Sequence, residues 1–284
     1  MYVVATPIGN LEDISTRGLR ILGEVDLILA EDTRHSVNLL RHFGIETPLK
    51  SLHEFNEREI VPLIADKLRQ GRNLALISDA GTPLISDPGY QLVHTLAAEG
   101  IRVVPIPGPS AIITALSVGG LSTARFVFEG FVPSNRTGRQ KVLKSLAYET
   151  RTLVLFEAPH RIVAFLEDAA DAFGGDRDAV LARELTKKFE TIYRGSLGEL
   201  RDKLKTGEDD IKGEFVVMIA GYKEEKSRLD LESARVLKIL LAHSLTVREA
   251  AAIAAEITGA RKNTLYKQAL ELEQERRANP SSSD

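Results

Sequence analysis

The sequence predicts an α/β protein with two α/β domains, the first built on a parallel sheet and the second on a mixed sheet, followed by a C-terminal three-helix unit. Three observations lead to this fold class. Short apolar runs alternate with helical patterns over residues 1–119, and a second such series covers 120–222. Over 229–278 the strand-like runs stop, and apolar residues recur every three or four positions, as on one face of a helix.

The first stretch predicts a sheet covered by helices on both faces. Strands are expected at YVVA, LILA, PLKSLH, LALIS and IRVVP, and helices at 15–25, 35–43, 57–70, 90–99 and after Pro109. Strand–helix alternation with short connections is typical of parallel sheets. Gly71 and Gly100 each stand where a helix should end before the next strand, a position that favours a left-handed residue.

The second stretch repeats the pattern with different connections. FVFEGFV, TLVLFEA, AVLARE and EFVVMIAG are expected strands, ETIYRGS is a further candidate, and helices are expected at 138–148, 160–172 and 197–205. The connections, together with Gly174 and Gly175, favour a mixed sheet over a purely parallel one. Residues 223–230 form a charged linker.

The third stretch predicts three helices over 229–278. Thr246 and Glu249 have the spacing of a capping box, and Gly259 should end that helix. The arrangement resembles a helix-turn-helix with Arg261, Lys262 and Lys267 on the following helix. A bundle that closes the domain or forms a dimer interface is the alternative, because basic and acidic residues are balanced from Leu229 onward. The final NPSSSD is expected to be disordered.

Length and composition limit the class of protein. A chain of 284 residues is too long for one ordinary core, and 43% hydrophobic with 27% charged residues is usual for a globular protein. The 37 basic and 40 acidic residues nearly balance, so a nucleic-acid partner would be held by local patches. The sequence contains no run of about 18 apolar residues, and it starts with the strand-like YVVA in place of a basic-apolar leader. These features predict a cytoplasmic protein without a membrane partner.

Several familiar chemistries are excluded by the sequence. The chain has no cysteine, hence no disulfide, thiol nucleophile or Cys-ligated zinc. It contains neither a P-loop nor a dinucleotide fingerprint, and no G-x-S-x-G motif that would raise a serine nucleophile. The six histidines lack metal-ligand spacing, and turn capping is the simpler role for Asp79 and Asp87. No metal is predicted.

Two loops rich in turn-forming residues are the most informative features. LALISDAGTPLISDPGY (74–90) joins a buried strand to a helix through glycines, prolines and small polar residues, and VVPIPGPSA (103–111) follows it. Either loop alone could need Gly and Pro only to turn the chain. Two such loops after successive strands of one sheet favour a cleft for a small polar molecule.

Charged side chains also gather where the expected strands end. They are Glu31, Asp32 and Arg34; His53 and Glu54; Glu157, His160 and Arg161; and Arg183, Glu184 and Lys187. Ligand sites of α/β proteins lie at such strand ends, although Asp32 and Glu157 could equally cap the helices that follow. A further basic stretch, with Arg136, Arg139, Lys141 and Lys144 and no acid, suits either phosphate contacts or an ordinary solvated loop.

Six motifs in order resemble one family. ATPIGNLEDIS, AEDTR, SDAGTPLISDPG, PGPSA, LFEAPHR and RELTK, between residues 5 and 188, are similar to the ribosomal small-subunit RNA 2′-O-methyltransferase I family. That family belongs to the tetrapyrrole-methylase-like class of S-adenosylmethionine enzymes. No motif core departs from the family pattern, and the helical tail resembles its RNA-contacting C-terminal unit.

The resemblance implies a cofactor cleft between the two α/β domains. Carried over by position, the residues that bind S-adenosylmethionine are Pro7, Asp79, Gly81, Thr82 and Leu84 in the loops of the first domain, Ser110 and Ala111 at the methionine part, and Phe156 and Ala182 beside the adenosine. This cofactor carries no phosphate, which agrees with the missing phosphate-binding motifs.

The resemblance also implies the reaction, the transfer of a methyl group to a ribose 2′-hydroxyl, in a cytidine of small-subunit ribosomal RNA, by SN2 displacement. A nearby base should help the alcohol lose its proton, and Glu31, Asp32, His53 and Glu184 remain open as candidates. Candidate RNA contacts are Arg34, Arg136, Arg139, Lys141, Arg161, Lys187, Arg261, Lys262 and Lys267. The assembled small subunit as substrate and a homodimeric enzyme follow from the same resemblance.

Two alternative functions also fit parts of the sequence. A C-methyltransferase for a tetrapyrrole precursor belongs to the same superfamily, but the helical tail and the 136–144 cations argue against it. A non-catalytic regulator that senses a ligand and binds duplex DNA through the C-terminal helices would transfer no methyl group. RNA binding and methyl transfer discriminate among the three.

Overall fold

The computed structural model describes residues 1–206, 211–223, 228–243 and 245–278. The chain divides into two compact units, Met1–Tyr222 and Lys223–Asp284. Of the linker predicted over 223–230, residues 224–227 lie outside the described residues, and 228–230 belong to a helix. The predicted disordered end, 279–284, also lies outside them.

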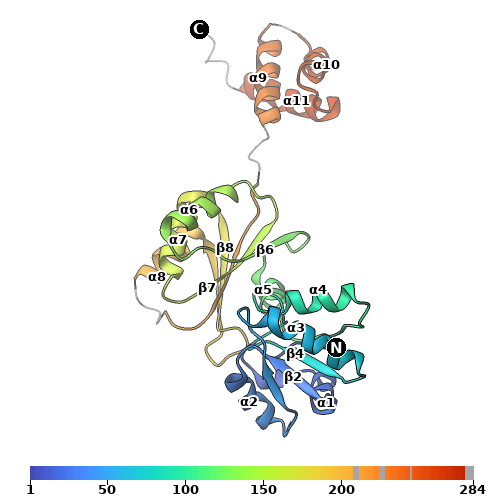
Figure 1. Ribbon diagram of the computed structural model, residues 1–284. Helices are drawn as coiled ribbons and strands as arrows, with labels where there is room; N and C mark the ends of the chain where they lie inside the picture. The colour runs from blue at the N-terminus through green and yellow to red at the C-terminus, as the bar shows by residue number, and fades with distance from the viewer. Residues whose placement is uncertain (207–210, 224–227, 244, 279–284) are drawn as a thin grey trace. The chain divides into compact units, whose positions relative to one another are not determined.

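The first sheet is parallel throughout, as predicted (Figure 1). Its strands are β1 (Tyr2–Val4), β2 (Leu27–Ala30), β3 (Leu49–Ser51), β4 (Leu74–Ile77) and β5 (Val104–Ile106), in the order β3-β2-β4-β1-β5. The helices are α1 (Thr16–Glu24), α2 (Thr33–His42), α3 (Glu57–Arg69), α4 (Tyr90–Ala98) and α5 (Ala111–Gly119), with a 3-10 turn η1 (Leu11–Asp13). Gly71 and Gly100 have φ of +83° and +70°, which confirms their left-handed positions after α3 and α4.

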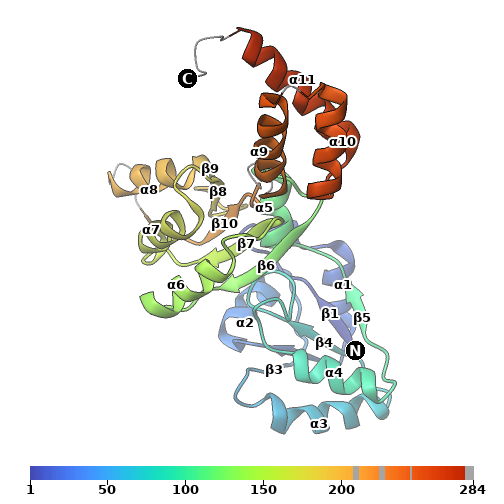
Figure 2. The same ribbon diagram turned by 90° about the horizontal axis from the view of Figure 1, so that it is seen from above.

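Both faces of this sheet are buried, which explains why its strands are apolar without alternation. On β2, Leu29 packs in one core cluster with residues of α3 and α4, two helices that lie side by side in Figure 2. Its neighbours Ile28 and Ala30 pack in another cluster with residues of α1 and α2. Successive side chains of a strand point to opposite faces, so each face receives its own layer of helices.

The strand order places a crevice between β2 and β4. After β2 the chain crosses outward to β3 at one edge of the sheet, and after β4 it crosses to β5 at the other edge. Where the crossovers of neighbouring strands diverge, the carboxyl ends of an open sheet leave room for a ligand. Glu31, after β2, and Asp79, after β4, therefore lie on the two sides of this crevice.

The second sheet is mixed, also as predicted. It consists of β6 (Phe126–Phe131), β7 (Thr152–Glu157), β8 (Asp178–Arg183), β9 (Thr191–Ser196) and β10 (Phe215–Ile219), in the order β6-β7-β10-β8-β9. Only β6 and β7 pair in parallel. Side chains of α6 (Arg136–Ser145), α7 (Ile162–Phe173) and α8 (Leu197–Lys205) form the core on one face. The other face packs on α5, so this helix joins the two sheets.

The C-terminal unit contains the three predicted helices, α9 (Arg228–Ala242), α10 (Val247–Thr258) and α11 (Lys262–Ala278). They share a small core formed by Leu237, Leu241, Ala250, Ala251, Ala254, Leu265 and Ala269. The capping box is confirmed, since Glu249 N–H donates to Thr246 Oγ1 and the Glu249 carboxylate accepts from Thr246 N–H at 3.0 Å. Gly259 ends α10 with φ of +73°.

Two kinds of feature are not found in the described part of the chain. No helix there is long and apolar enough to cross a bilayer. No group of three or more His, Cys, Asp or Glu residues among those described could hold a metal ion.

Candidate active site

The loops after β1, β4 and β5 are tied together by backbone hydrogen bonds. Thr6 N–H donates to Gly81 O at 2.9 Å, and Gly81 N–H donates to Thr6 O at 3.0 Å. The hydroxyl of Thr82 then donates to Pro109 O at 3.1 Å, which adds the third loop. Gly81 has φ of +80°, which a side chain would strain. Two backbone hydrogen bonds and one from the Thr82 hydroxyl thus hold the three loops together at the carboxyl edge of the first sheet.

The loop over residues 78–89, here called the signature loop, is strained. Leu84 and Ser86 have φ of +73° and +69°, values that are uncommon for residues other than glycine. Gly89, with φ of +122°, leads into α4, and a Cβ there would lie 2.7 Å from Leu76 Cδ2. Such conformations persist only where the surroundings hold them, and they gather at ligand sites.

A cavity of about 360 Å³, here called the first cavity, lies beside this loop. Its walls come from the carboxyl edge of the first sheet, from the ends of β6, β7 and β8 with the start of β10 in the second sheet, and from the start of α5. Six of the nine residues expected to bind the cofactor line it: Gly81, Thr82, Ser110, Ala111, Phe156 and Ala182. Leu84 is not among the lining residues, and Pro7 and Asp79 line a neighbouring cavity.

One wall of the first cavity is an apolar row that crosses the second sheet. Val216 of β10 is paired with Phe156 of β7 on one side and with Ala182 of β8 on the other. Directly opposed residues in antiparallel strands point to the same face, so the three side chains form a continuous surface. Phe131 lies against Phe156, with 5.5 Å between ring centroids. A flat apolar ring fits such a wall.

The first cavity also has charged lining residues, all of them acidic. Its charged lining residues are Asp87, Glu157 and Glu214, and none of the described lining residues is Lys or Arg. Ser110, the N-cap of α5, makes no side-chain cap hydrogen bond. The first N–H groups of α5 are therefore available to an anion, and the helix dipole favours one there.

A second cavity, of about 370 Å³, adjoins the first. It is lined by Pro7, Ile8, Gly9, Leu11, His35, Asn38, Leu39, Asp79, Ala80, Lys187 and Glu214. Ile8, Ala80 and Glu214 line both cavities. The two spaces thus meet at the edge where the β1 loop faces the signature loop.

An acidic group surrounds the junction between β2 and β4. Burial raises the pKa of Glu31, and the nearby carboxylates of Asp87 and Asp79 raise it further. Burial also raises the pKa of Asp87, against a hydrogen bond from Ser78 that lowers it. Asp79 Oδ1 accepts from Asp32 N–H at 3.2 Å, across the crevice. A cation bound nearby would relieve this repulsion.

The four candidate bases have different surroundings. Hydrogen bonds from Arg34 hold the pKa of Asp32 at about 2, so this carboxylate accepts a proton poorly. Burial raises the pKa of Glu184, but hydrogen bonds from Lys187 and Glu214 N–H outweigh it and leave the pKa lowered. His53 Nδ1 is buried without a hydrogen-bond partner among the described residues. Glu31, whose pKa is raised, suits proton abstraction best.

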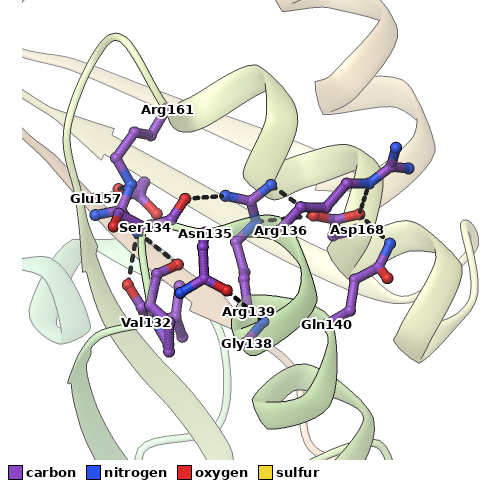
Figure 3. A network of polar contacts seen from close by, with 11 residues as sticks. Val132, Ser134, Asn135, Arg136, Gly138, Arg139, Gln140, Glu157, Arg161 and Asp168 are labelled. Atoms are coloured by element: carbon purple, nitrogen blue, oxygen red, sulfur yellow. Dashed lines mark hydrogen bonds and ion pairs between the residues drawn. The ribbon is translucent and has the colours of Figure 1, made fainter.

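Arg139, predicted to contact RNA, is buried in an ion pair. Its side chain is 6% exposed, and Nη2 lies 2.6 Å from Oδ2 of Asp168, whose side chain is 1% exposed. Gln140 donates to the same carboxylate at 2.7 Å, and Arg136 at 3.3 Å (Figure 3). Arg139 therefore joins α6 to α7 and is not placed to reach a phosphate. The sequence predicts the helix here from residue 138 and allows a solvated loop before it, but α6 already begins at Arg136, after Asn135 as N-cap.

Arg161, also predicted to contact RNA, is likewise held by contacts within the second α/β domain. Nε lies 3.0 Å from Oε1 of Glu157, and Nη2 donates to Val132 O at 2.6 Å. Burial raises the pKa of Glu157, although Ala158 N–H and Arg161 act to lower it. Arg161 is the N-cap residue of α7, so it links β7, α7 and the end of β6 (Figure 3).

The other predicted RNA contacts are more accessible. The side chains of Arg34 and Arg136 are 90% and 70% exposed, although each contacts a carboxylate. Lys141 on α6, and Arg261, Lys262 and Lys267 in the C-terminal unit, are exposed. Lys187 is half-buried between Glu184 and Glu214 and lines the second cavity.

The sequence did not single out several residues of the two cavities. Val216 completes the apolar wall, yet EFVVMIAG predicted only a buried strand. Asn38 and Leu39 face the second cavity from α2, where the helical pattern gave no sign of a site. Gly9 lies inside the ATPIGN motif, and its lack of a side chain was the one available signal.

Comparison with known proteins identifies the family. The family described as Tetrapyrrole (Corrin/Porphyrin) Methylases matches residues 1–201, and an RsmI C-terminal HTH domain matches residues 228–273. The chain is 55% identical to ribosomal RNA small subunit methyltransferase I of Pseudomonas aeruginosa, over 95% of this chain and 96% of the relative. The chain belongs to the ribosomal RNA small subunit methyltransferase I family. The relative of the same name from Escherichia coli O157:H7 is 51% identical, over 95% and 94% of the two chains.

Solved structures confirm the fold of this family member. Cobalt precorrin-4 methyltransferase superposes with a TM-score of 0.56 and 18% identity, over 77% of this chain and 93% of the other. Diphthine synthase superposes with a TM-score of 0.58 and 18% identity, over 77% and 88%. At this identity the likeness concerns the fold alone. This member of the small subunit methyltransferase I family thus shares its α/β architecture with cobalt precorrin-4 methyltransferase and with diphthine synthase.

Proposed function

We propose that this protein transfers a methyl group from S-adenosylmethionine to the 2′-oxygen of a cytidine in small-subunit ribosomal RNA. The observation that carries the proposal is the first cavity, where an apolar wall, a helix N-terminus without a side-chain cap and acidic lining residues meet. The relatives named ribosomal RNA small subunit methyltransferase I support the reaction and the RNA. The methylated atom, a ribose 2′-oxygen, and the target nucleotide, a cytidine, are inferred from the motif resemblance.

The residues present fit S-adenosylmethionine, which has an aromatic base, a cationic sulfonium and an amino-acid end but no phosphate. Phe156, Val216 and Ala182 would flank the adenine. Ser110 and Ala111, at the start of α5, would hold the carboxylate through the helix N–H groups. A cavity whose charged lining side chains are all acidic suits a cation and would repel a phosphate-bearing nucleotide.

The chain's own contribution to the reaction is mainly alignment. When bound, the cofactor supplies an activated methyl group. The hydrogen bonds between Thr6 and Gly81 and between Thr82 and Pro109 hold the carboxyl edge of the first sheet in place. Both reactants must lie beside this edge. Holding two reactants in a near-attack arrangement accounts for a large part of the rate in such transfers. The strained signature loop fits this role because its conformation is set before any ligand arrives.

Glu31 is the base that we propose for the acceptor hydroxyl. Its raised pKa, from burial and from Asp87 and Asp79, brings it closer to the pH at which a general base works best. Asp32 and Glu184 are held by Arg34 and Lys187, which makes them poor acceptors of a proton. His53 follows β3, the neighbour of β2, and stays the second candidate.

The RNA would be held by exposed cations on two parts of the chain. On the α/β unit these are Arg34, Arg136 and Lys141, and on the helical unit they are Arg261, Lys262 and Lys267. Each cation that neutralises a phosphate adds to the salt dependence of binding. RNA enzymes commonly recognise shape and neighbouring structure, so the assembled small subunit is the expected substrate. A homodimer is expected from the motif resemblance.

The test combines binding with transfer. Calorimetric titration with S-adenosylmethionine should give micromolar or tighter binding. Incubation with tritiated cofactor and purified small subunits should then place the label in 2′-O-methylcytidine after nuclease digestion. Cofactor binding without labelled RNA would favour a small acceptor such as a tetrapyrrole precursor. Absence of cofactor binding would refute the enzyme assignment and favour the ligand-sensing regulator.

A further inference from the structure

Only two of the nine residues expected to bind the cofactor, Pro7 and Asp79, line the second cavity, and we infer that it receives the single nucleotide that is methylated. The inference rests on the proposed function and adds the site of the acceptor to it. The cavity is lined by the β1 loop over residues 7–11, by α2 with His35, Asn38 and Leu39, by Asp79 and Ala80 of the signature loop, and by Lys187 and Glu214. Residues 184–187 are here called the Lys187 turn.

The position of the second cavity relative to the first supports this assignment. The two cavities share Ile8, Ala80 and Glu214 and therefore adjoin at this edge. The first cavity, about 360 Å³, already has the size of a small-molecule pocket and contains the apolar wall and the helix N-terminus. A second space of about 370 Å³ is then left for the other reactant.

The lining of the second cavity has the chemistry of a nucleoside site. Leu11 and Leu39 offer apolar surface to the faces of a base. Asn38 carries both a donor and an acceptor, which suits the edge of a base, and its one hydrogen bond given by the structure is a long one of 3.4 Å to Arg34 O. Asp79 lies where the cavity meets the crevice between β2 and β4, close to the proposed base Glu31.

Lys187 is held rigidly at the wall of this cavity. Its ammonium donates to Glu184 at 2.9 Å and to Glu214 at 2.8 Å, which accounts for two of its three N–H groups. A Cβ on Gly9 would lie 2.4 Å from Lys187 Cγ, so the β1 loop and the Lys187 turn touch directly. Two carboxylates neutralise the ammonium, which therefore suits a hydroxyl of the ribose better than a phosphate.

The size of the cavity also restricts the form of the RNA. A space of about 370 Å³ is within the range of small-molecule pockets and suits one nucleotide. A nucleotide in such a cavity is expected to be unstacked from its neighbours, as in the loops and bulges that proteins commonly recognise in RNA. The exposed cations outside the cavity would hold the flanking phosphates.

Filling the cavity with a larger side chain tests the inference. In Leu39→Trp the indole should occupy the space, and in Asn38→Ala the amide is lost. Arg41→Trp, at an exposed position of the same helix outside the lining, is the matched control for an added indole. Each variant is compared with the wild type in thermal melting, in S-adenosylmethionine titration, and in tritium transfer to purified small subunits.

Leu39→Trp should bind S-adenosylmethionine within about twofold of the wild type but lose at least ~100-fold in transfer, because a displaced acceptor cannot align. Asn38→Ala should mainly raise KM for the subunit, and Arg41→Trp should act like the wild type. Equal loss of cofactor affinity in Leu39→Trp would place this cavity in the cofactor site and overturn the inference. Wild-type transfer rates in Leu39→Trp would overturn it too. A wild type that binds cofactor but labels no RNA would instead refute the proposed function.

Discussion

Replacing Asp168 by Asn tests whether the Arg139 cluster has a structural role. The carboxylate of Asp168 is 1% exposed and accepts from Arg139, Gln140 and Arg136. The Asn side chain keeps the size but leaves the Arg139 guanidinium, 6% exposed, without its counter-charge. Removing one partner of a buried ion pair typically costs about 3–5 kcal/mol. Arg136 adds little to this figure because its side chain is 70% exposed.

The expected effect is large enough to measure by thermal melting. For a unit of this size, 1 kcal/mol shifts Tm by about 2–4 °C, so Asp168→Asn should lower the melting temperature of the α/β unit by about 6–20 °C. The double variant Arg139→Met/Asp168→Leu removes both charges and should recover most of that loss. Cofactor affinity should not change in either variant, because neither residue lines the first or the second cavity.

The same pair predicts a pH dependence of stability. Burial raises the pKa of Asp168, but hydrogen bonds from Gln140 and Arg139 outweigh it, so the folded pKa lies below the ordinary value. A carboxyl with a lowered folded pKa stabilises the fold above its unfolded pKa, and that stability is lost as pH falls toward the folded value. The stability difference between the wild type and Asp168→Asn should therefore shrink below about pH 4.

Two results would refute this reasoning. The first is a melting temperature of Asp168→Asn equal to that of the wild type. The second is a loss of RNA affinity in Arg139→Met without loss of stability, which would return Arg139 to the RNA surface. Lys141→Met, on the exposed side of the same helix, is the control for the loss of one positive charge.

Three further predictions concern other parts of the molecule. Gly81→Ala must adopt φ of +80° with its Cβ 3.3 Å from Ile8, so calorimetry should show weaker cofactor binding; unchanged affinity would mean that the loop adapts. Thr246→Ala removes the capping box and should destabilise α10 by about 1 kcal/mol in denaturant titration, whereas an unaltered midpoint would contradict the cap. Because burial and Asp87 raise the pKa of Glu31, wild-type transfer should increase with pH through an apparent pKa above that of an ordinary glutamate, and Glu31→Gln should lack this rise. A profile of Glu31→Gln parallel to that of the wild type would exclude Glu31 as the base.

The fold was predictable because its signals are local. Apolar runs, helix caps such as Thr246–Glu249 and left-handed glycines such as Gly71 depend on neighbours in sequence. The turn-rich loops at the carboxyl edge of the first sheet were predictable for the same reason, since the signature loop contains its own turn residues. The burial of Arg139 was not, because its partner Asp168 is 29 residues away and only the packing of α6 on α7 brings them together. An exposed cation and a buried one look alike in a sequence.

The same limit applies to the second cavity and to the bases. Asn38, Lys187 and Gly9 come from three distant segments, so no window of sequence could show them together. The pKa of Asp32 is lowered by Arg34, whereas the pKa of Glu31 is raised by burial and then by Asp87 and Asp79. Sequence analysis could name the candidates but not their surroundings.

The small overlap between the two cavities has a consequence for how such enzymes diversify. Among the described residues, only Ile8, Ala80 and Glu214 line both spaces. If the second cavity holds the acceptor, substitutions on α2 or in the Lys187 turn can change the acceptor site while the site of the methyl donor stays unchanged. One scaffold could then accumulate changes in acceptor choice without passing through forms that no longer bind the donor. Exchanging α2 between members of this superfamily is accordingly a practical route to enzymes with altered acceptors.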